Sequence, residues 1–207
     1  MKLTIISDTH MRHEELGPLS GDVLIHCGDF LKHEETETDL DNIDRWFGQQ
    51  DFGLIVCIGG NHDFALQARS ERTTQCFHNA VYLEDSALQY EGVNFYGAPW
   101  TPELRFFAFF QDRAGLQKKW DLIPEDTHVL ITHTPPYDIL DKSSRGLVLG
   151  CPLLMRRVKS IAPVLHCFGH VHASAGQETV DGTHFVNAAS IRKPDMPLRP
   201  PVIIKLD

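Results

Sequence analysis

Residues 54–63 read LIVCIGGNHD, an apolar run that gives way at once to glycine and polar residues. The run 54–58 is short and carries β-branched side chains, which is typical of a strand buried on both faces. Directly after it, Asn61, His62 and Asp63 supply a carboxamide, an imidazole and a carboxylate. In open α/β sheets, reactive groups collect at the carboxyl ends of the strands. This stretch therefore predicts an α/β fold with a candidate site at one edge of a sheet.

The same pattern occurs four more times along the chain. Apolar runs at 3–6, 23–25, 129–131 and 164–168 are each followed by residues that can bind a metal ion. Those residues are Ser7-Asp8-Thr9-His10, His26-Cys27-Gly28-Asp29, Thr132-His133 and Gly169-His170-Val171-His172. Singly, short motifs such as Asp-x-His or Gly-Asp are more often ordinary turns. Five of them, each after an apolar run, favour one shared site over five unrelated turns.

Helical patterns separate several of these runs, at 39–47, 111–120 and 152–161. Further apolar runs at 93–96, 185–186 and 202–204, with the turn pairs Glu91-Gly92 and Asp181-Gly182, indicate hairpins later in the chain. We therefore expect an α/β fold, an αββα sandwich of two mixed β-sheets flanked by helices, formed by residues 1–207 as a single domain. The loop-rich zones at 10–20, 97–110 and 134–150 are expected to border the site.

Composition narrows the class of protein. The chain has 207 residues, of which 42% are hydrophobic, and this length and content suit one domain with a sizeable core. A formal net charge of -9 argues against wrapping a long nucleic acid but leaves small anionic substrates possible. The run 3–6 is too short for a signal peptide or a membrane span, so we expect a cytoplasmic protein without membrane contact. Five cysteines without a close CxxC pair argue against a disulfide framework.

Taken together, the five motifs resemble those of the calcineurin-like metallophosphoesterase family: Asp-x-His, Gly-Asp, Gly-Asn-His-Asp/Glu, His and Gly-His-x-His. The resemblance implies the calcineurin-like phosphoesterase fold and two divalent metal ions as cofactors. It implies that His62 faces the phosphate without binding a metal, and that Asp29 bridges the two ions. The implied ligands are Asp8, His10, Asp29 and His172 for one ion, and Asp29, Asn61, His133 and His170 for the other.

A closer resemblance is to the metallophosphoesterase-domain-containing subgroup of that family. It is carried by Tyr96-Gly97-Ala98-Pro99-Trp100-Thr101-Pro102, by residues 120–124 (WDLIP) and by the stretch from 132–136 (THTPP) to Asn187-Ala188. This subgroup implies a phosphodiesterase that hydrolyses a small substrate such as a cyclic nucleotide, by attack of a metal-bridging hydroxide. The alternatives are a phosphomonoesterase or nucleotide pyrophosphatase on the same centre, and a non-catalytic interaction module.

The residue types agree with such chemistry. Imidazole and carboxylate ligands suit Mn, Fe, Zn or Ni without selecting one of them. Only Asp8 and Asp29 among the implied ligands carry negative charge, so two divalent ions would keep a surplus of positive charge that attracts a phosphate. Two ions about 3.5 to 4 Å apart can polarise the phosphoryl oxygens and ionise a water molecule. His62 is the natural general acid for the leaving group, and Asp63 either orients it or is an acid at a helix N-terminus.

Three further residues are weaker candidates for binding substrate. Arg12 and His13 follow the first motif and could touch phosphate, although a solvated loop explains them equally well. Trp100, like Phe106 and Phe107, could stack on a nucleobase, but a hydrophobic cover or a partner surface is the favoured interpretation of this aromatic segment. His26 and His166 lie inside apolar runs and are expected in the core. Nothing in the sequence indicates an oligomeric state.

Overall fold

The computed structural model describes residues 1–32, 36–73, 75–102, 104–192 and 195–206, and its strands form two mixed β-sheets. In the first sheet, four parallel strands are joined at one edge by an antiparallel fifth, in the order β11-β1-β2-β3-β4. Its strands are β1 (Lys2–Ile6), β2 (Ser20–His26), β3 (Asp51–Cys57), β4 (Val81–Tyr82) and β11 (Val202–Lys205).

The second sheet has the strand order β5-β6-β7-β8-β10-β9, with four parallel inner strands and an antiparallel strand at each edge. Its strands are β5 (Ser86–Tyr90), β6 (Val93–Ala98), β7 (Val129–Thr132), β8 (Leu165–Phe168), β9 (Gly176–Val180) and β10 (Thr183–Asn187). All eight apolar runs in the sequence therefore lie in strands, as predicted.

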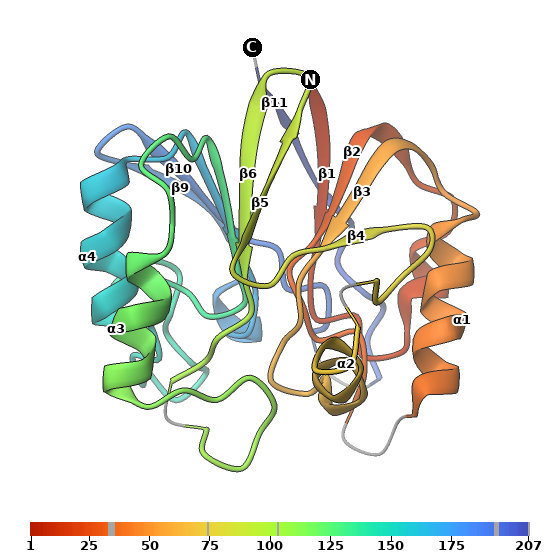
Figure 1. Ribbon diagram of the computed structural model, residues 1–207, viewed down its shortest axis with the longest axis horizontal. Helices are drawn as coiled ribbons and strands as arrows, with labels where there is room; N and C mark the ends of the chain where they lie inside the picture. The colour runs from red at the N-terminus through yellow and green to blue at the C-terminus, as the bar shows by residue number, and fades with distance from the viewer. Residues whose placement is uncertain (33–35, 74, 103, 193–194, 207) are drawn as a thin grey trace.

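Helices cover the outer faces of the two sheets (Figure 1). α1 (Glu37–Phe47) lies against the first sheet, and α3 (Arg113–Asp121) and α4 (Pro152–Ile161) lie against the second, which confirms the predicted αββα sandwich. A shorter helix, α2 (Phe64–Ser70), directly follows the loop after β3. Within the described ranges, no helix is long and apolar enough to span a membrane.

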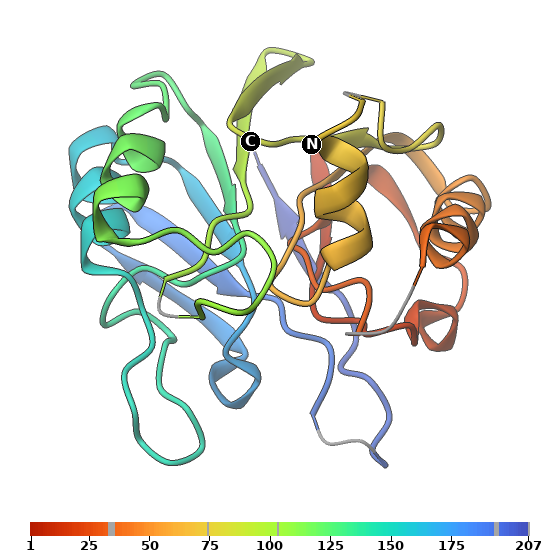
Figure 2. The ribbon, with the colours of Figure 1, turned by 60° about the horizontal axis from the view of Figure 1, so that its bottom comes forward.

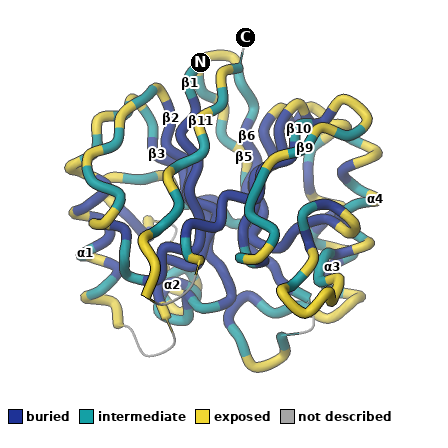
Figure 3. Tube along the Cα trace, turned by 180° about the vertical axis from the view of Figure 1, so that it is seen from behind, coloured by how far each residue is buried: buried dark blue, intermediate teal, exposed yellow. Residues whose placement is uncertain are grey.

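The central strands are buried on both faces because one face meets the opposite sheet and the other meets helices. In β1, Leu3 and Ile5 belong to the cluster between the sheets, whereas Ile6 belongs to the cluster beneath the helices. In β7, Val129 belongs to the cluster between the sheets and Leu130 belongs to the cluster beneath the helices. Figure 3 shows the resulting buried interior, in dark blue, with the exposed segments around it. The continuous apolar runs in the sequence follow from this double burial.

Both predicted hairpins are present, and their turns explain their sequences. Glu91 and Gly92 have φ angles of 47° and 80°, and Asp181 and Gly182 have φ angles of 50° and 87°. Two successive positive φ angles match the type I′ turn, which favours glycine at its second position. The sequence analysis missed α2 and β4, because elements of seven and two residues are too short to show a periodic pattern.

The parallel strands of both sheets end at the same edge, which is the lower edge in Figure 1 and comes forward in Figure 2. The two sheets meet there through a parallel bridge between Ser7 and Ala189, and the amide of Ser190 donates to the carbonyl of Ser7 over 2.8 Å. The loops predicted to border the site, at 10–20, 97–110 and 134–150, follow strands at this edge; residue 103 lies outside the described part of the chain. Loops from both sheets therefore converge on one place.

Candidate metal centre

The ends of five strands bring all the predicted ligand residues to one place. The loops after β1 and β2 continue side by side, since the amide of Asp8 donates to the carbonyl of Gly28 over 2.9 Å and that of His10 to the carbonyl of Asp29 over 3.1 Å. The remaining ligand candidates follow the other strands: Asn61 after β3, His133 after β7, and His170 and His172 after β8.

The backbone of this site is held in an uncommon conformation. Asp8, His10, Asp29 and His170 all have positive φ angles, of 53°, 43°, 57° and 67°. Such angles are uncommon outside glycine and, where surrounding contacts enforce them, tend to cluster at functional sites. Gly60 adds a steric requirement, because a Cβ atom there would collide with the backbone and side chain of Asp29. The backbone conformation of these loops therefore brings the candidate ligand side chains close together.

One group of candidate ligands consists of Asp8, His10 and His172, whose donor atoms lie within 4.8 Å of one another. His172 Nε2 is 3.1 Å from Asp8 Oδ1. His10 Nδ1 is hydrogen-bonded to the carbonyl of Leu31 over 2.8 Å, which leaves Nε2 facing the centre, 3.7 Å from Asp29 Oδ2. A backbone carbonyl that holds one ring nitrogen and so orients the other is the usual partner of a metal-binding histidine.

A second group forms on the side of β7 and β8. His133 Nδ1 is 2.8 Å from the carbonyl of Cys27, so Nε2 faces inward, 3.0 Å from Asn61 Oδ1. His170 Nδ1 reaches the same Asn61 oxygen, over 2.8 Å. Three donor atoms from three separate strands therefore converge on one point, and Asp8, Asp29 and His133 also have donor atoms within 4.8 Å of one another.

Asp29 lies between the two groups. Its Oδ1 accepts the backbone N–H of His62 over 2.8 Å. Its Oδ2 lies 3.7 Å from His10 Nε2 and 3.4 Å from His133 Nε2, and so faces one histidine of each group. Asp29 is therefore the carboxylate that would contact a cation in either group.

The carboxyl groups of Asp8 and Asp29 are ionised although both are buried. Burial raises the pKa of each, but the hydrogen bond and charge of His172 on Asp8, and the charge and hydrogen bond of His133 on Asp29, outweigh it and hold both pKa values well below the usual range. Burial likewise opposes charge on His133, yet Asp29 raises the pKa of His133 to about 9. Burial and the charge of His133 lower the pKa of His170 to about 4.

The donor set fits divalent transition-metal ions. Two buried carboxylates attract positive charge: Asp29 raises the pKa of His133 and Asp8 raises the pKa of His172, each against the effect of burial. A cation binds the neutral imidazole, so it competes with protons for these rings. Imidazole, carboxylate and carboxamide donors without a thiolate are suited to Mn, Fe, Zn or Ni.

The site has a buried floor and a more open rim. Asp8, Asp29, Asn61 and His133 form the floor, each with at most 3% of its surface exposed. The rim consists of the half-buried His62, His170 and His172, and the side chain of His172 is 36% exposed. A small molecule can therefore reach the centre from the rim side, where the ring of His62 meets the rings of His10 and Phe107 at centroid distances of 4.9 and 5.5 Å.

Asp63 is the N-cap residue of α2, as expected for an acid at a helix N-terminus, but its carboxylate binds other backbone groups. Its carboxylate accepts the backbone N–H groups of Asp29 and Gly60 over 2.8 Å, and that of Leu31 over 2.9 Å, and it makes no capping hydrogen bond to α2. Burial and the charge of Asp29 raise the pKa of the Asp63 carboxyl. Asp63 thus joins the loop after β2 to the loop after β3.

Arg12 and His13, the two basic candidates for binding phosphate, have their contacts elsewhere. The guanidinium of Arg12 donates to Glu15 Oε1 over 2.7 Å and to the carbonyl of Met196 over 2.8 Å. The ring of His13 is buried against Trp46 at a centroid distance of 5.1 Å, and burial lowers its pKa. A 3₁₀ turn at His13–Leu16 turns the chain away directly after the first motif, so neither residue is retained in the proposed substrate site.

Trp100 is also directed into the fold. Only 7% of its surface is exposed, its Nε1 donates to Asp85 Oδ1 over 2.6 Å, and Lys119 Nζ lies 4.0 Å above its ring. The favoured interpretation of the aromatic segment, a hydrophobic cover, therefore describes Trp100, while Phe107 of the same segment meets His62.

Arg199 is a residue at the site that the sequence analysis missed. Its guanidinium donates to the backbone carbonyls of Ala189 and His172, over 3.1 and 3.0 Å, and so fixes the segment that carries His172. Arg199 follows β10 by a loop without any recognisable motif, so no sequence pattern marks it.

His26 in β2 and His166 in β8 are buried in the core, as predicted. His26 Nε2 is 3.0 Å from Thr9 Oγ1, and His166 Nε2 is 2.9 Å from Thr132 Oγ1. Burial lowers the pKa of each imidazole to about 3, so both are neutral. Each pairs with a threonine next to a candidate ligand, since Thr9 separates Asp8 from His10 and Thr132 precedes His133.

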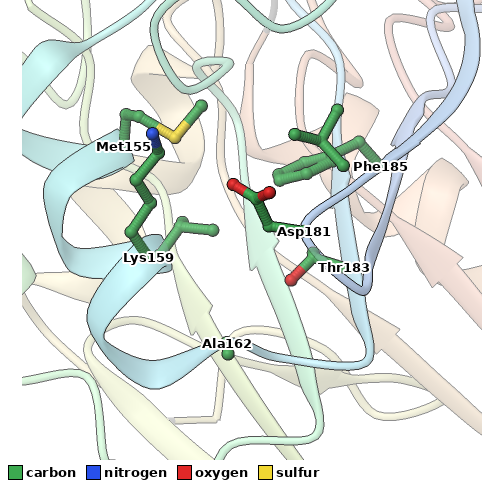
Figure 4. A pocket seen from close by; sticks show the side chains of 8 residues that line it. Met155, Lys159, Ala162, Asp181, Thr183 and Phe185 are labelled. Carbon is green, nitrogen blue, oxygen red and sulfur yellow. The ribbon is translucent and has the colours of Figure 1, made fainter.

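A cavity between α4 and the β9–β10 hairpin is separate from this centre. Figure 4 shows Met155, Lys159, Asp181 and Phe185 around it. The turn at 181–182 precedes β10, and β10 runs parallel to β8, so this cavity lies at the amino edge of the sheet. The candidate metal centre lies at the opposite, carboxyl edge.

Comparison with known proteins agrees with the geometry. The family model for calcineurin-like phosphoesterases matches residues 1–174. The chain is 31% identical to human metallophosphoesterase domain-containing protein 1, over 99% of this chain and 71% of that protein. It is 34% identical to the UPF0046 protein K07C11.7 of Caenorhabditis elegans, over 93% of this chain and 71% of that protein.

Solved structures share the fold at low sequence identity. One crystal structure superposes with a TM-score of 0.63 at 19% identity, covering 90% of this chain and 89% of its own. GAP50, described as the anchor in the inner membrane complex of Plasmodium, superposes with a TM-score of 0.52 at 10% identity, covering 92% of this chain and 71% of its own. The family match, with these relatives, confirms the resemblance found in the sequence: the chain belongs to the calcineurin-like phosphoesterase family.

Proposed function

We propose that this chain is a phosphodiesterase that uses two divalent metal ions to hydrolyse a small phosphodiester. The observation that carries the proposal is the position of Asp29 Oδ2, between His10 of one donor group and His133 of the other. Family membership supports metal-dependent hydrolysis of phosphoesters, and the preference for a diester is our addition.

In the proposed site, one ion is held by Asp8, His10, Asp29 and His172, and the other by Asp29, Asn61, His133 and His170. When bound, such a pair supplies positive charge that polarises the phosphoryl group and ionises water near neutral pH. The protein's part is to orient the donors: the carbonyls of Leu31 and Cys27 direct the inner nitrogens of His10 and His133 toward the centre.

His62 is proposed to act on the leaving group. Hydrolysis forms a bond between phosphorus and a water oxygen and breaks the bond from phosphorus to the leaving oxygen, which must take up a proton to depart as an alcohol. The backbone of His62 is fixed to Asp29 Oδ1, while its ring stands half-exposed at the rim. An imidazole there can donate that proton, and we propose His62 as the general acid.

The distribution of charged side chains favours a diester over a monoester. A phosphate monoester carries about two negative charges near pH 7, whereas a diester carries one. Two arginines near the site have other partners: Arg12 pairs with Glu15, and Arg199 donates to backbone carbonyls. The proposed ions then supply most of the positive charge for the substrate, which is sufficient for a monoanion.

The proposal is tested with two chromogenic substrates, bis-p-nitrophenyl phosphate and p-nitrophenyl phosphate, assayed with added Mn and after chelation. We expect Mn-restored turnover with a higher kcat/KM for the diester. A higher kcat/KM for the monoester would support the alternative, a phosphomonoesterase or nucleotide pyrophosphatase on the same centre. Repeating the assay with Fe, Zn and Ni identifies the metal that gives the highest turnover.

The fold alone also permits a different role. GAP50 shares it and is described as an anchor, so an interaction module without turnover is the competing proposal. The convergence of Asn61, His133 and His170 favours an enzyme, because an interaction surface does not require three buried or half-buried donors at one point. Absence of turnover with any ester after loading with Mn, Fe, Zn or Ni would support the module instead. The cytoplasmic location stays a prediction.

A further inference from the structure

The loop between β6 and α3 carries four phenylalanines, and the structure divides them by surroundings. Phe109 is fully buried and Phe110 is half-buried. Phe107 is half-buried, with its ring edge against His62, and Phe106 beside it is 88% exposed. One half of this aromatic pattern therefore belongs to the core, and the other half lies at the rim of the candidate metal centre.

The loop is attached firmly to the metal centre at its base. The amide of Ala108 donates to the carbonyl of Asn61 over 3.0 Å, and the amide of Phe109 donates to Gln67 Oε1 over 3.0 Å. Thr101 and Phe110 form a parallel bridge that closes the loop. Because these bonds link the loop to the same segment that carries Asn61 and His62, the position of Phe107 relative to His62 is set by the backbone.

The contact with His62 indicates which part of the substrate Phe107 would face. If His62 donates its proton to the leaving oxygen, the group attached to that oxygen must lie next to the imidazole. The Phe107 ring is 5.5 Å from that imidazole, at an interplanar angle of 76°. Phe107 therefore lies where the leaving group begins, and Phe106, the preceding residue, is exposed to solvent.

We infer that Phe107, extended by Phe106, is a specificity-determining platform for a planar aromatic leaving group, such as an aryl alcohol or a group that ends in a nucleobase. This inference rests on the proposed function and adds the class of substrate to it. An exposed phenylalanine ring offers a flat face without polar groups, and a base stacks on such a face with little selectivity among bases. The exposure of Phe106, which no core contact explains, is consistent with this use.

The test compares two esters whose leaving groups have similar acidity but different shapes: a p-nitrophenyl ester and a fluorinated alkyl ester, both hydrolysed by the Mn-loaded protein. In F107L, which keeps an apolar side chain but removes the ring, we expect the ratio of kcat/KM for the aryl ester to that for the alkyl ester to fall about tenfold. In F106A we expect a smaller fall in the same direction. Leu122 in the C-cap of α3 is also an exposed apolar residue, so L122A is the matched control and should leave the ratio unchanged.

Binding supplies a second readout that does not depend on turnover. The Kd of phenylphosphonate, measured by calorimetry on the Mn-loaded protein, should rise about tenfold in F107L, while that of methylphosphonate should change much less. An unchanged aryl-to-alkyl ratio together with an unchanged phenylphosphonate Kd would overturn the inference and leave the proposed function intact. Absence of turnover in the wild-type protein after loading with Mn, Fe, Zn or Ni would overturn the proposed function itself.

Discussion

The floor and the rim of the candidate metal centre are built in different ways. On the floor, each donor has a backbone or buried partner that sets its orientation, as the carbonyl of Cys27 does for His133. On the rim, the backbone N–H of His62 donates to Asp29 Oδ1, and the ring of His62 lies against the rings of His10 and Phe107. In the proposed site, the floor therefore holds the ions together with His10, His170 and His172, and His62 faces the substrate.

This difference separates two kinds of mutational effect. Substitution on the floor should remove the ions and all activity with them, whereas substitution of His62, which is not among the proposed ligands, should change turnover while the ions stay bound. Substitutions of Asp29, His62 and Asp63 test that separation.

Asp29→Ala should abolish binding of both ions and reduce turnover below detection, because the shared oxygen between the two donor groups is lost. Metal content per chain after dialysis against Mn is the measurement. Asp51→Ala, which removes an exposed carboxylate at the start of β3, is the control and should retain both ions. Retention of both ions in Asp29→Ala would show that this carboxylate is not shared.

His62→Ala should keep both ions but lower kcat by about a hundredfold or more, because a general acid contributes a factor of this size. The loss should be smaller for a substrate whose leaving group is acidic enough to depart without a proton. His78, which is exposed on the loop before β4, provides the control in His78→Ala. A drop in metal content in His62→Ala would place His62 among the ligands instead.

Asp63→Ala should weaken metal binding by about 10 to 100-fold, the usual effect of losing a partner that orients ligands. It leaves the amides of Asp29, Gly60 and Leu31 without their acceptor, which should lower the free energy of unfolding by about 3 kcal/mol. Asp63→Asn keeps one carbonyl oxygen and should recover part of both losses. Calorimetric titration with Mn and urea unfolding measure the two effects, and an unchanged metal affinity in Asp63→Ala would contradict the assigned role.

The smallest expected effect is on the pH dependence of stability and concerns His166, which is buried in the core. The pKa of buried His166 is lowered from 6.5 to about 3, so the unfolded chain binds a proton there as the pH falls below 6.5 while the folded protein does not. Stability must then decrease as the pH falls through this window, by about 2 kcal/mol from this residue between pH 7 and 5. His166→Gln should lose less stability than the wild type over that range.

Urea unfolding of the chelated protein at pH 7, 6 and 5 measures this difference. Phe168→Leu serves as a non-titrating control in the same core and should stay below the wild type by an amount that does not change with pH. If wild type and His166→Gln lose stability in parallel, His166 is not the neutral core residue described here.

The donors of the floor and the three histidines of the rim were largely predictable from the sequence, and the other residues around the rim were not. Asp8, Asp29, Asn61 and His133 each follow an apolar run, and parallel strands end at the same edge, so strand ends alone predict their convergence. The sandwich followed from the same runs, together with the turn pairs at 91–92 and 181–182. Ligand roles for these residues stay predictions until metal binding is measured.

Which other residues lie around the rim depends on the direction of side chains within loops, and no periodic pattern in the sequence encodes that direction. Arg12 and His13 directly follow a ligand motif, yet a single 3₁₀ turn carries them away from it. Trp100 and Phe107 lie in one aromatic segment, yet the first packs into the core and the second meets His62. No motif in the sequence marks Arg199, because its partners are backbone carbonyls and every residue has a backbone carbonyl.

The central claim is that two cations lie on either side of Asp29. Anomalous diffraction from crystals of the Mn-loaded protein tests it most directly. The account predicts two anomalous peaks, one among Asp8, His10 and His172 and the other among Asn61, His133 and His170, with Asp29 in contact with both. A single peak, or peaks away from these side chains, would contradict it.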